Sequence, residues 1–385
     1  MSNILFINTY INPKHGGVEK VTNIIATALN ERGHKIYFAY ANPDEEADAN
    51  IYEQTCVGFE NLEEFIVLHQ ITTIINQAAH IRHFTDLIKQ IKKSIPQINI
   101  ISCLHNDPTF LWKDFDFHND NLINRIKNKE QLTIKNIIKY VTFPVYNRLI
   151  KRKFANNYRK IYNNSDHIVL LSEQYITPYK KLSHLKDSAK FRSIPNPITI
   201  DIRKTNKEKK DIALIVARLT EIKRINLAID VWHEANKRYQ ELRNWELHIY
   251  GSGPCEKELK EQTQYLKMTN VIFKGFCFSP IEAYETAKIF LMTSLYEGWG
   301  LTLTESQSQG VIPIVFDTFL SLKDIVNDGI NGCIIKNNDI NSMAETLISL
   351  IKDKNKIQRL SRNAIISSQK FHIDKIVKQW ENLIA

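Results

Sequence analysis

The stretch IFLMTSLYEGWGLTLTESQSQG, residues 289–310, combines an apolar strand pattern, a turn with glycines at 298 and 300, and a helical pattern that begins near Thr302. Glycine lets the backbone turn sharply. The start of a helix presents unpaired N–H groups and the positive end of its dipole, which attract phosphate. A strand that passes through a short turn into a helix is the repeating unit of parallel α/β sheets, so this stretch predicts that fold class.

The same alternation extends through the second half of the chain. Strand patterns occur at 212–217, 245–251 and 271–275, and helical patterns at 224–239, 255–267 and 280–287. In the first half, a strand at 4–8 leads into a helix that runs to Leu29, and further strands are expected at 35–41, 98–105 and 166–172. Both halves therefore resemble doubly wound α/β domains.

A chain of 385 residues exceeds what one hydrophobic core usually holds, which predicts two domains. The stretch FRSIPNPITI (191–200) contains two prolines and interrupts the periodicity, so it is interpreted as the linker. The expected domains are residues 1–198 and 199–367, followed by one long helix at about 368–385. Residues 110–165 exceed a simple connection and are interpreted as a helical insertion in the first domain.

The composition is that of an ordinary globular protein, with 43% hydrophobic and 24% charged residues. No signal peptide or transmembrane stretch is recognised, and the five cysteines form no C-x-x-C pair. We therefore expect a cytoplasmic protein with reduced thiols.

The net charge of +9 is concentrated in the insertion. Residues 123–160 hold eleven Lys and Arg residues against the single acidic residue Glu130. Three explanations are open: a solvated helical face packed on the core, a surface for anionic membrane, or nucleic-acid binding. No nucleic-acid motif supports the last, so no nucleic-acid partner is expected.

Two cations follow the strand at 212–217, namely Arg218 and Lys223. Ligands of open α/β sheets bind at the carboxyl ends of the strands, and two cations at that edge suit a diphosphate. Taken alone, the two residues are better interpreted as ordinary surface charges in a solvated turn, and they indicate a ligand site only together with the helix start. Likewise Glu305 has two interpretations, because Thr302-Leu303-Thr304-Glu305 also has the T-x-x-E form of a capping box.

Other signals are weaker. G-x-G at 251–253 lacks the third glycine and the acidic residue of a dinucleotide site, so a plain turn is favoured. Gly16 and Gly17 follow the first strand, and His105 ends another. The D-x-D of Asp114 and Asp116, which could hold a divalent metal, lies in the insertion with no strand before it, and we interpret it as coincidence.

Arg218 and Lys223, together with the Glu297-x7-Glu305 turn in the second of two similar domains, resemble the retaining GT-B glycosyltransferases, specifically glycosyltransferase family 4. The similarity is most specific over residues 213–335 and extends in the first half to GGVEKV and His105. Trp299 departs from the phenylalanine usual between the two glycines. The resemblance implies two Rossmann-like domains facing across a cleft, with the last helix crossing back to the first domain.

The resemblance also implies roles for individual residues. Arg218 and Lys223 are expected to hold the donor diphosphate, Glu305 the ribose hydroxyls, and Glu297 the transferred sugar. Residues implied as catalytic are Glu297, His105, Arg218 and Lys223, and those implied in donor binding also include Gly300, Leu301, Thr302, Gly16 and Gly17. No metal and no cofactor are expected beyond the nucleotide sugar itself.

These observations lead to one functional hypothesis. The chain is expected to transfer a sugar, with retention, from a UDP-sugar to a glycan or lipid-linked acceptor in surface polysaccharide synthesis, on the inner face of the cytoplasmic membrane. A GDP-sugar donor, and a nucleotide-sugar epimerase or hydrolase on the same fold, are the alternatives. A Rossmann oxidoreductase and a non-catalytic sugar-binding subunit are further classes to be distinguished.

Overall fold

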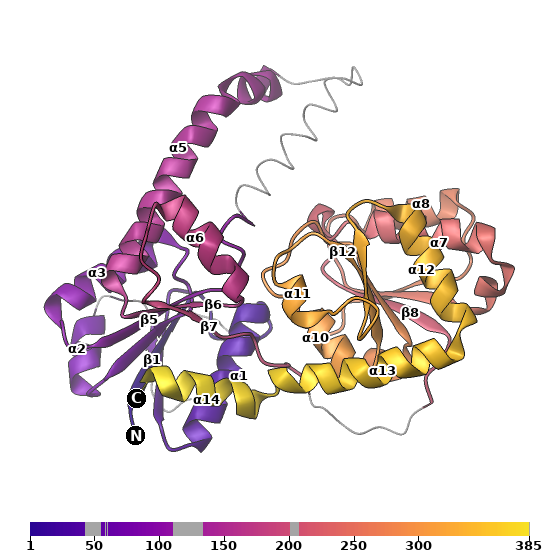
Figure 1. The fold of residues 1–385 in the computed structure, drawn as a ribbon. Coiled ribbons are helices and arrows are strands. Elements are labelled where there is room, and N and C mark those ends of the chain that lie inside the picture. The colour runs from indigo at the N-terminus through magenta and orange to yellow at the C-terminus, as the bar shows by residue number, and fades with distance from the viewer. Residues whose placement is uncertain (43–54, 58, 60, 111–133, 201–207, 385) are drawn as a thin grey trace. The chain divides into compact units, whose positions relative to one another are not determined.

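The computed structural model describes residues 1–42, 55–57, 59, 61–110, 134–200 and 208–384, with side chains for all of them except 55–57 and 134–147. The chain divides into two compact units. The first comprises Met1–Pro195 together with Ile376–Ala385, and the second comprises Asn196–Lys375 (Figure 1). The boundary lies within the stretch interpreted from the sequence as a linker.

The first unit is built on a parallel sheet with the strand order β3-β2-β1-β4-β5-β6-β7. Its strands are β1 (Asn3–Asn8), β2 (Lys35–Tyr40), β3 (Thr55–Val57), β4 (Thr73–Asn76), β5 (Asn99–Leu104), β6 (His167–Leu170) and β7 (Phe191–Ser193). The helices between them are α1 (Gly17–Glu31), α2 (Leu62–Leu68), α3 (Arg82–Ser94), α5 (Ile134–Asn164) and α6 (Ile176–Ser183).

Alternate side chains of these strands face opposite sides of the sheet. Leu5, Ile7 and Ile74 pack in one buried cluster with Ile66 of α2 and Ile88 of α3. Because both faces of a parallel sheet must be covered, most of the residues of these strands are apolar, and polar residues stand mainly at the strand ends.

Two parts of the first unit differ from the sequence interpretation. The strands β3 and β4 and the helices α2, α3 and α6 were not predicted, and residues 191–193, expected to be linker, form β7. A strand of three or four residues is too short to show a period, and its existence depends on the neighbour with which it pairs. β7 is an edge strand that pairs only with β6.

The second unit is a parallel sheet with the order β10-β9-β8-β11-β12-β13. Its strands are β8 (Ile212–Val216), β9 (Glu246–Tyr250), β10 (Val271–Gly275), β11 (Ile289–Met292), β12 (Ile312–Asp317) and β13 (Cys333–Lys336). Its helices are α7 (Ile225–Arg238), α8 (Glu256–Tyr265), α9 (Ile281–Thr286), α10 (Leu301–Ser308), α11 (Leu322–Ile325), α12 (Ile340–Lys352) and α13 (Lys354–Ser368). The alternation predicted between 212 and 292 is confirmed.

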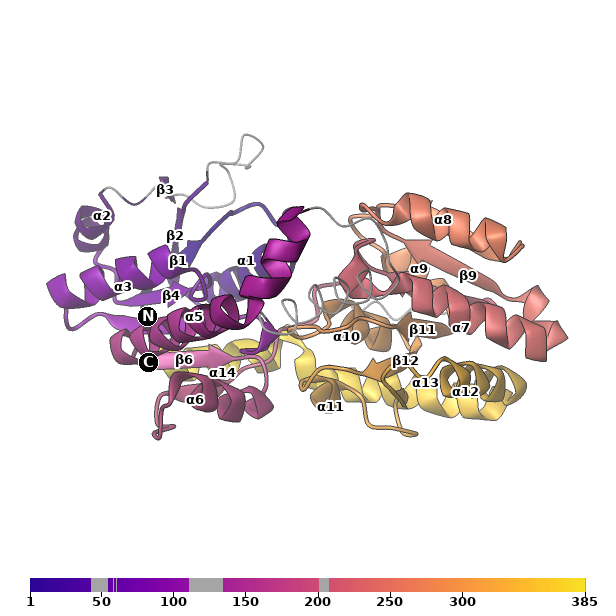
Figure 2. The ribbon, with the colours of Figure 1, turned by 90° about the horizontal axis from the view of Figure 1, so that it is seen from above.

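Helices cover both faces of this second sheet as well (Figure 2). Ala213, Ile215 and Leu291 pack with Trp232 of α7 and Leu347 of α12 in one buried cluster. On the alternate face, the ring of Phe290 lies 6.3 Å from that of Tyr284 in α9. Two doubly wound, Rossmann-like units are thus present, as expected.

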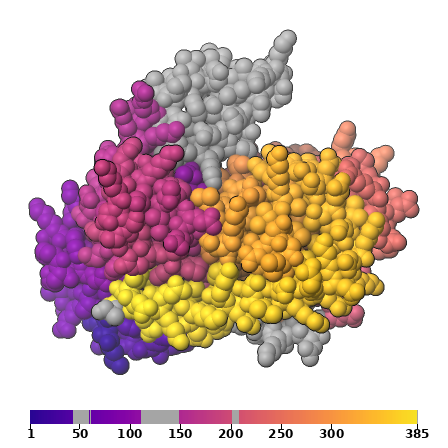
Figure 3. All heavy atoms as spheres, in the orientation of Figure 1, coloured from indigo at the N-terminus to yellow at the C-terminus, as the bar shows by residue number. Residues whose placement is uncertain are grey.

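The C-terminal segment is not the single long helix that was expected. α13 ends at Ser368, and α14 (Ile373–Ile384) begins after an extended residue, His372, which interrupts the helical hydrogen bonds. From Ile376 onward the segment packs in the first unit. α13 and α14, in yellow, are partly open to the surface in Figure 3.

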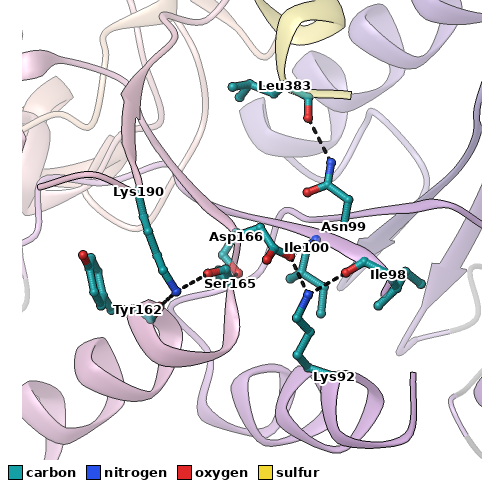
Figure 4. Close-up of polar contacts among 10 residues, drawn as sticks. Lys92, Ile98, Asn99, Ile100, Tyr162, Ser165, Asp166, Lys190 and Leu383 are labelled. Atoms are coloured by element: carbon teal, nitrogen blue, oxygen red, sulfur yellow. Dashed lines mark hydrogen bonds and ion pairs between the residues drawn. The ribbon is translucent and has the colours of Figure 1, made fainter. Parts of the chain in front are cut away.

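Side chains at the amino ends of the strands hold α14 and neighbouring elements of the first unit in place (Figure 4). Asn99 Nδ2 donates to the backbone oxygen of Leu383 at 2.9 Å. Lys92 Nζ lies 2.7 Å from Asp166 Oδ2, which also accepts the backbone N–H of Ile100 at 2.9 Å. This edge of the sheet is therefore occupied by structural contacts, and the opposite, carboxyl edge carries the candidate residues.

Within the described residues, no helix is both long and apolar enough to span a membrane. Cys103, Cys255, Cys277 and Cys333 are free thiols.

Candidate functional site

The candidate site of the second unit lies where the order of its strands reverses. From β8 the chain proceeds to β9 on one side and later returns to β11 on the other. The loops that follow β8 and β11 diverge at this point, and ligands of open α/β sheets bind there, at the carboxyl ends of the strands. Residues 217–224 and 293–300 form these two loops.

A lysine and a glutamate meet across the two loops. Lys223 Nζ, at the end of the β8 loop, lies 2.5 Å from Glu297 Oε1 in the β11 loop. Their side chains are 24% and 14% exposed, so the pair is partly buried but can be reached from solvent. Two residues that the sequence separates by 74 positions are thereby brought into direct contact.

Arg218 lies in the same β8 loop and is exposed. Its backbone oxygen accepts the N–H of Thr220 at 2.9 Å, which holds the start of the loop in a tight turn. Within the described part of the chain, its guanidinium forms no hydrogen bond or ion pair. The side chain is therefore available to an anionic ligand from solution.

α10 begins one residue earlier than the sequence indicated. Gly300 is its N-cap, with a left-handed backbone at φ 88° that favours glycine, and Leu301 is the first helical residue. Thr302 therefore lies inside the first turn, and the T-x-x-E stretch is not a capping box. The backbone N–H groups of Leu301 and Thr302 belong to the helix start, where no intrahelical partner is available.

Glu305 is held inside the second unit and is only 4% exposed. Its Oε2 accepts the hydroxyl of Tyr284 at 3.0 Å, and its Oε1 accepts the hydroxyl of Thr199. Burial, and then the charge of the nearby Glu305, raise the pKa of Tyr284 well above its usual value, so the phenol remains a donor. Sequence reasoning missed both hydroxyl partners, and its prediction that Glu305 binds ribose remains a prediction.

The glycines of the G-x-G stretch have a packing role. A Cβ on Gly251 would lie 1.9 Å from the backbone oxygen of Ala217, and one on Gly253 would lie 2.4 Å from that of Leu219. The backbone N–H of Leu219 also donates to the backbone oxygen of Ser252 in the loop after β9, at 2.9 Å. The stretch is a turn that supports the β8 loop, in agreement with the interpretation favoured from the sequence.

Arg224 is a site residue that sequence reasoning did not find. It follows Lys223, is only 8% exposed, and has a left-handed backbone at φ 47°. Burial lowers the pKa of its guanidinium to about 10, so the group remains charged at neutral pH. An arginine in a polar turn resembles any surface cation, and no local signal marks it as buried.

In the first unit, Gly16 and Gly17 stand at the start of α1, with Gly16 as N-cap in an extended conformation. His105 follows β5 at the same carboxyl edge, and its Nε2 lies 2.6 Å from Oε1 of Gln77, which follows β4. Burial lowers the pKa of His105 to about 3, so the imidazole is neutral at physiological pH. With Nε2 donating to Gln77, its Nδ1 is an acceptor.

Asp114 and Asp116 lie outside the described residues. Among the residues that are described, no group of three or more His, Cys, Asp or Glu side chains could hold a metal ion.

Residues 198–366 match the sequence model of a family described as "Glycosyl transferases group 1". The chain is 26% identical over 234 residues to the "Poly(glycerol-phosphate) alpha-glucosyltransferase" of Bacillus subtilis (strain 168). That alignment covers 60% of this chain and 34% of the relative, so the chain spans about a third of the length of that protein.

Solved structures are similar over the whole chain. TarM of S. aureus, crystallised as a mutant in complex with Fondaparinux, alpha-GlcNAc-glycerol and UDP, has a TM-score of 0.72 and 13% identity, covering 100% of both chains. HepE of Anabaena, in complex with UDP and glucose, has a TM-score of 0.71 and 16% identity, covering 99% of each. These similarities and the two parallel sheets show that the chain has the GT-B fold.

Proposed function

We propose that this protein is a retaining glycosyltransferase that moves a sugar from a UDP-sugar to a glycan or lipid-linked acceptor in surface polymer synthesis. The observation that carries the proposal is the contact between Lys223 and Glu297 at the strand-order reversal of the second unit, inside the segment that matches the glycosyl transferase family. The bond that breaks in a nucleotide sugar joins the sugar to the diphosphate. A cation at this edge suits the diphosphate, and a carboxylate suits the hydroxyls of the sugar.

In the proposed reaction, the glycosidic bond to the diphosphate breaks and the acceptor hydroxyl oxygen bonds to the anomeric carbon on the same face of the sugar. The hydroxyl proton passes to the departing diphosphate oxygen. Arg218 and Lys223 stabilise the negative charge on the leaving diphosphate, and the N–H groups at the start of α10 offer further donors to it. Glu297 contacts the hydroxyls of the transferred sugar. Glu305, oriented by Tyr284 and Thr199, would bind the ribose.

No metal is required in this proposal. Two cations and a helix start supply the positive charge that a divalent ion supplies in metal-dependent transferases.

The donor is proposed to be a UDP-sugar because the similar TarM and HepE structures contain UDP. The acceptor class rests on the similarity to the Bacillus relative, a poly(glycerol-phosphate) alpha-glucosyltransferase. A GDP-sugar donor is the alternative that the geometry of the second unit leaves open.

A donor panel tests the function. Purified protein is incubated with UDP- and GDP-sugars, with and without a glycan acceptor, and nucleoside diphosphate release is measured with the anomeric configuration of the product. We expect release that depends on the acceptor and an α product from an α donor. Rapid donor consumption without acceptor would indicate a hydrolase or epimerase, and binding without turnover would indicate a sugar-binding subunit.

We also propose that the first unit binds the acceptor and that α5 docks it on anionic membrane. Residues 154–162 of α5 pack on the core through Ala155, Tyr158 and Ile161, which are buried. Lys160 is used structurally, at 2.7 Å from Asp86. For residues 154–162, the basic segment is therefore explained as a helix that packs on the core of the first unit.

The preceding turn of α5 has a different character. Arg148, Lys151, Arg152 and Lys153 are exposed, and Leu149 among them is 57% exposed. An apolar side chain surrounded by cations suits the headgroup region of an anionic bilayer, where each Lys or Arg contributes about 1 kcal/mol.

Liposome sedimentation tests the docking. Wild type should pellet with anionic but not with neutral vesicles, and less so at 1 M salt than at 0.1 M. Lys151, Arg152 and Lys153 changed together to Gln should abolish pelleting. The matched control changes the exposed Lys257, Lys323 and Lys354 of the second unit to Gln, with the same loss of charge. Equal loss in both variants would contradict a specific role for α5.

A further inference from the structure

Arg224 connects three loops at the carboxyl edge of the second sheet. Its Nε donates to the backbone oxygen of Thr293 at 2.8 Å and its Nη2 to that of Ser294 at 3.2 Å, both in the β11 loop. Nη1 donates to Asn338 Oδ1 at 2.7 Å and Nη2 to Asn337 Oδ1 at 2.9 Å, in the loop after β13. The β8 loop, which carries Arg224, is thereby joined to both.

The β11 loop returns contacts to the same turn. Thr293 Oγ1 donates to the backbone oxygen of Arg224 at 2.9 Å, and the N–H of Leu295 donates to the oxygen of Ile222 at 2.8 Å. Lys223 lies between these two anchored residues, and Glu297 follows Leu295 by two positions. Both ends of the Lys223–Glu297 pair are therefore held by the contacts that surround Arg224.

The conformation and environment of Arg224 suit a fixed support. A left-handed backbone is unfavourable for a residue with a Cβ, and it persists only where surrounding contacts determine it. The oxygens that accept its hydrogen bonds are all uncharged, and the guanidinium also lies 5.8 Å from the ring centre of Phe316. Burying a cation among neutral acceptors costs free energy. Among the side chains, only arginine has a planar group with several N–H donors that can bond to two loops at once.

We propose that Arg224 is a positioning residue that holds Lys223 in the geometry needed to bind the second phosphate of a nucleoside diphosphate. The proposal rests on the proposed function, because it requires the Lys223 site to bind a diphosphate. A monophosphate can shift toward the cations that remain, whereas a diphosphate needs charges at a set separation. Loss of the support should therefore reduce the preference for diphosphate over monophosphate and leave nucleoside binding unchanged.

The test measures the affinities of uridine, UMP and UDP by calorimetry, with GDP and GMP in parallel, for wild type and Arg224→Met. We expect the ratio of UDP to UMP affinity to fall about tenfold in the variant, with uridine affinity unchanged. Arg224→Lys should behave like Arg224→Met, because lysine keeps the charge but cannot bridge both loops. A Lys variant with the wild-type ratio would show that charge alone matters and would overturn the positioning role.

Two further variants make the result decisive. Arg238→Met, at the other end of α7, removes an arginine bonded to Glu234 at 2.9 Å and should keep the wild-type ratio. The double variant Asn337→Ala with Asn338→Gly removes two hydrogen-bond partners of Arg224, and glycine at 338 accommodates the left-handed backbone of that position. It should lower the ratio of UDP to UMP affinity, and it provides the test if Arg224→Met does not fold.

If the ratio of UDP to UMP affinity is unchanged in a folded Arg224 variant, or in the double asparagine variant, the positioning role of Arg224 is wrong and the proposed diphosphate site is unaffected. Wild type that does not prefer a diphosphate to the corresponding monophosphate would overturn the proposed diphosphate site, and the inference with it.

Discussion

Changing Glu297 to Gln should move nucleotide affinity and turnover in opposite directions. In the structure Glu297 Oε1 lies 2.5 Å from Lys223 Nζ, so the carboxylate competes with a diphosphate for the same cation. An ion pair at this level of exposure is worth about 1 kcal/mol. Removing the charge of Glu297 should therefore strengthen UDP binding by up to about fivefold, since 1.4 kcal/mol corresponds to tenfold.

Turnover should fall in the same variant. If Glu297 contacts the transferred sugar, the substitution removes an interaction aligned with the transition state, and losses of this kind are about a hundredfold. Glutamine has nearly the same shape as glutamate, so the fold should be kept and the melting temperature should change little.

The assay combines UDP titration calorimetry, thermal unfolding and initial rates with the donor identified in the panel. Glu234→Gln is the matched control, because it breaks a salt bridge to Arg238 at 2.9 Å in the same unit without approaching the site. A Glu297→Gln enzyme with a kcat within about threefold of wild type would refute the contact with the sugar. Weaker UDP binding would refute the competition between Glu297 and the diphosphate.

Four other outcomes are expected. Glu305→Ala should weaken UDP and uridine binding, by about 1.5 to 3 kcal/mol for each charge-assisted hydrogen bond lost; calorimetry showing unchanged affinity with lower thermal stability would assign the carboxylate a structural role only. Arg218→Ala and Lys223→Ala should each raise the donor KM and lower kcat, and the double variant should show a non-additive loss; small additive changes would indicate ordinary surface charges. Activity should survive excess EDTA, and loss that manganese restores would contradict metal independence. Because burial lowers the pKa of His105 to about 3, only the unfolded chain binds a proton at this side chain between pH 6.5 and 3, and the free energy of unfolding should fall as the pH drops through this range. In denaturant titrations, His105→Gln should reduce the dependence of the unfolding free energy on pH by up to about 1.4 kcal/mol per pH unit. The same pH dependence in wild type and variant would contradict a buried neutral imidazole.

Local patterns were sufficient for most of the second unit. The runs at 212–216 and 289–292 are apolar, the run at 246–250 is mainly so apart from Glu246 and His248, and each is followed by a polar turn and a helical pattern. A parallel strand buried on both faces must have this composition, so periodicity and length predict it without any knowledge of neighbours. The carboxyl-edge positions of Lys223 and Glu297 followed from the same reasoning.

Elements that depend on their neighbours were missed. The four residues of β4 and the three of β7 are too short to show a period, and each becomes a strand by pairing with an adjacent one. The helix expected at 368–385 is interrupted at His372, where the chain leaves α13 and continues into the packing of the first unit. These outcomes follow from long-range pairing, which a window of sequence does not contain.

The contacts within the site were also decided by the tertiary structure. The order of the strands places the β8 loop beside those of β11 and β13, so that Arg224 meets Asn338, 114 positions further along the chain. A capping box fits the letters around Thr302, but the left-handed backbone of Gly300 starts the helix one residue earlier. Residue spacing specifies which side chains leave the same edge of a sheet, whereas the distances between them depend on which strands are neighbours and how their loops pack.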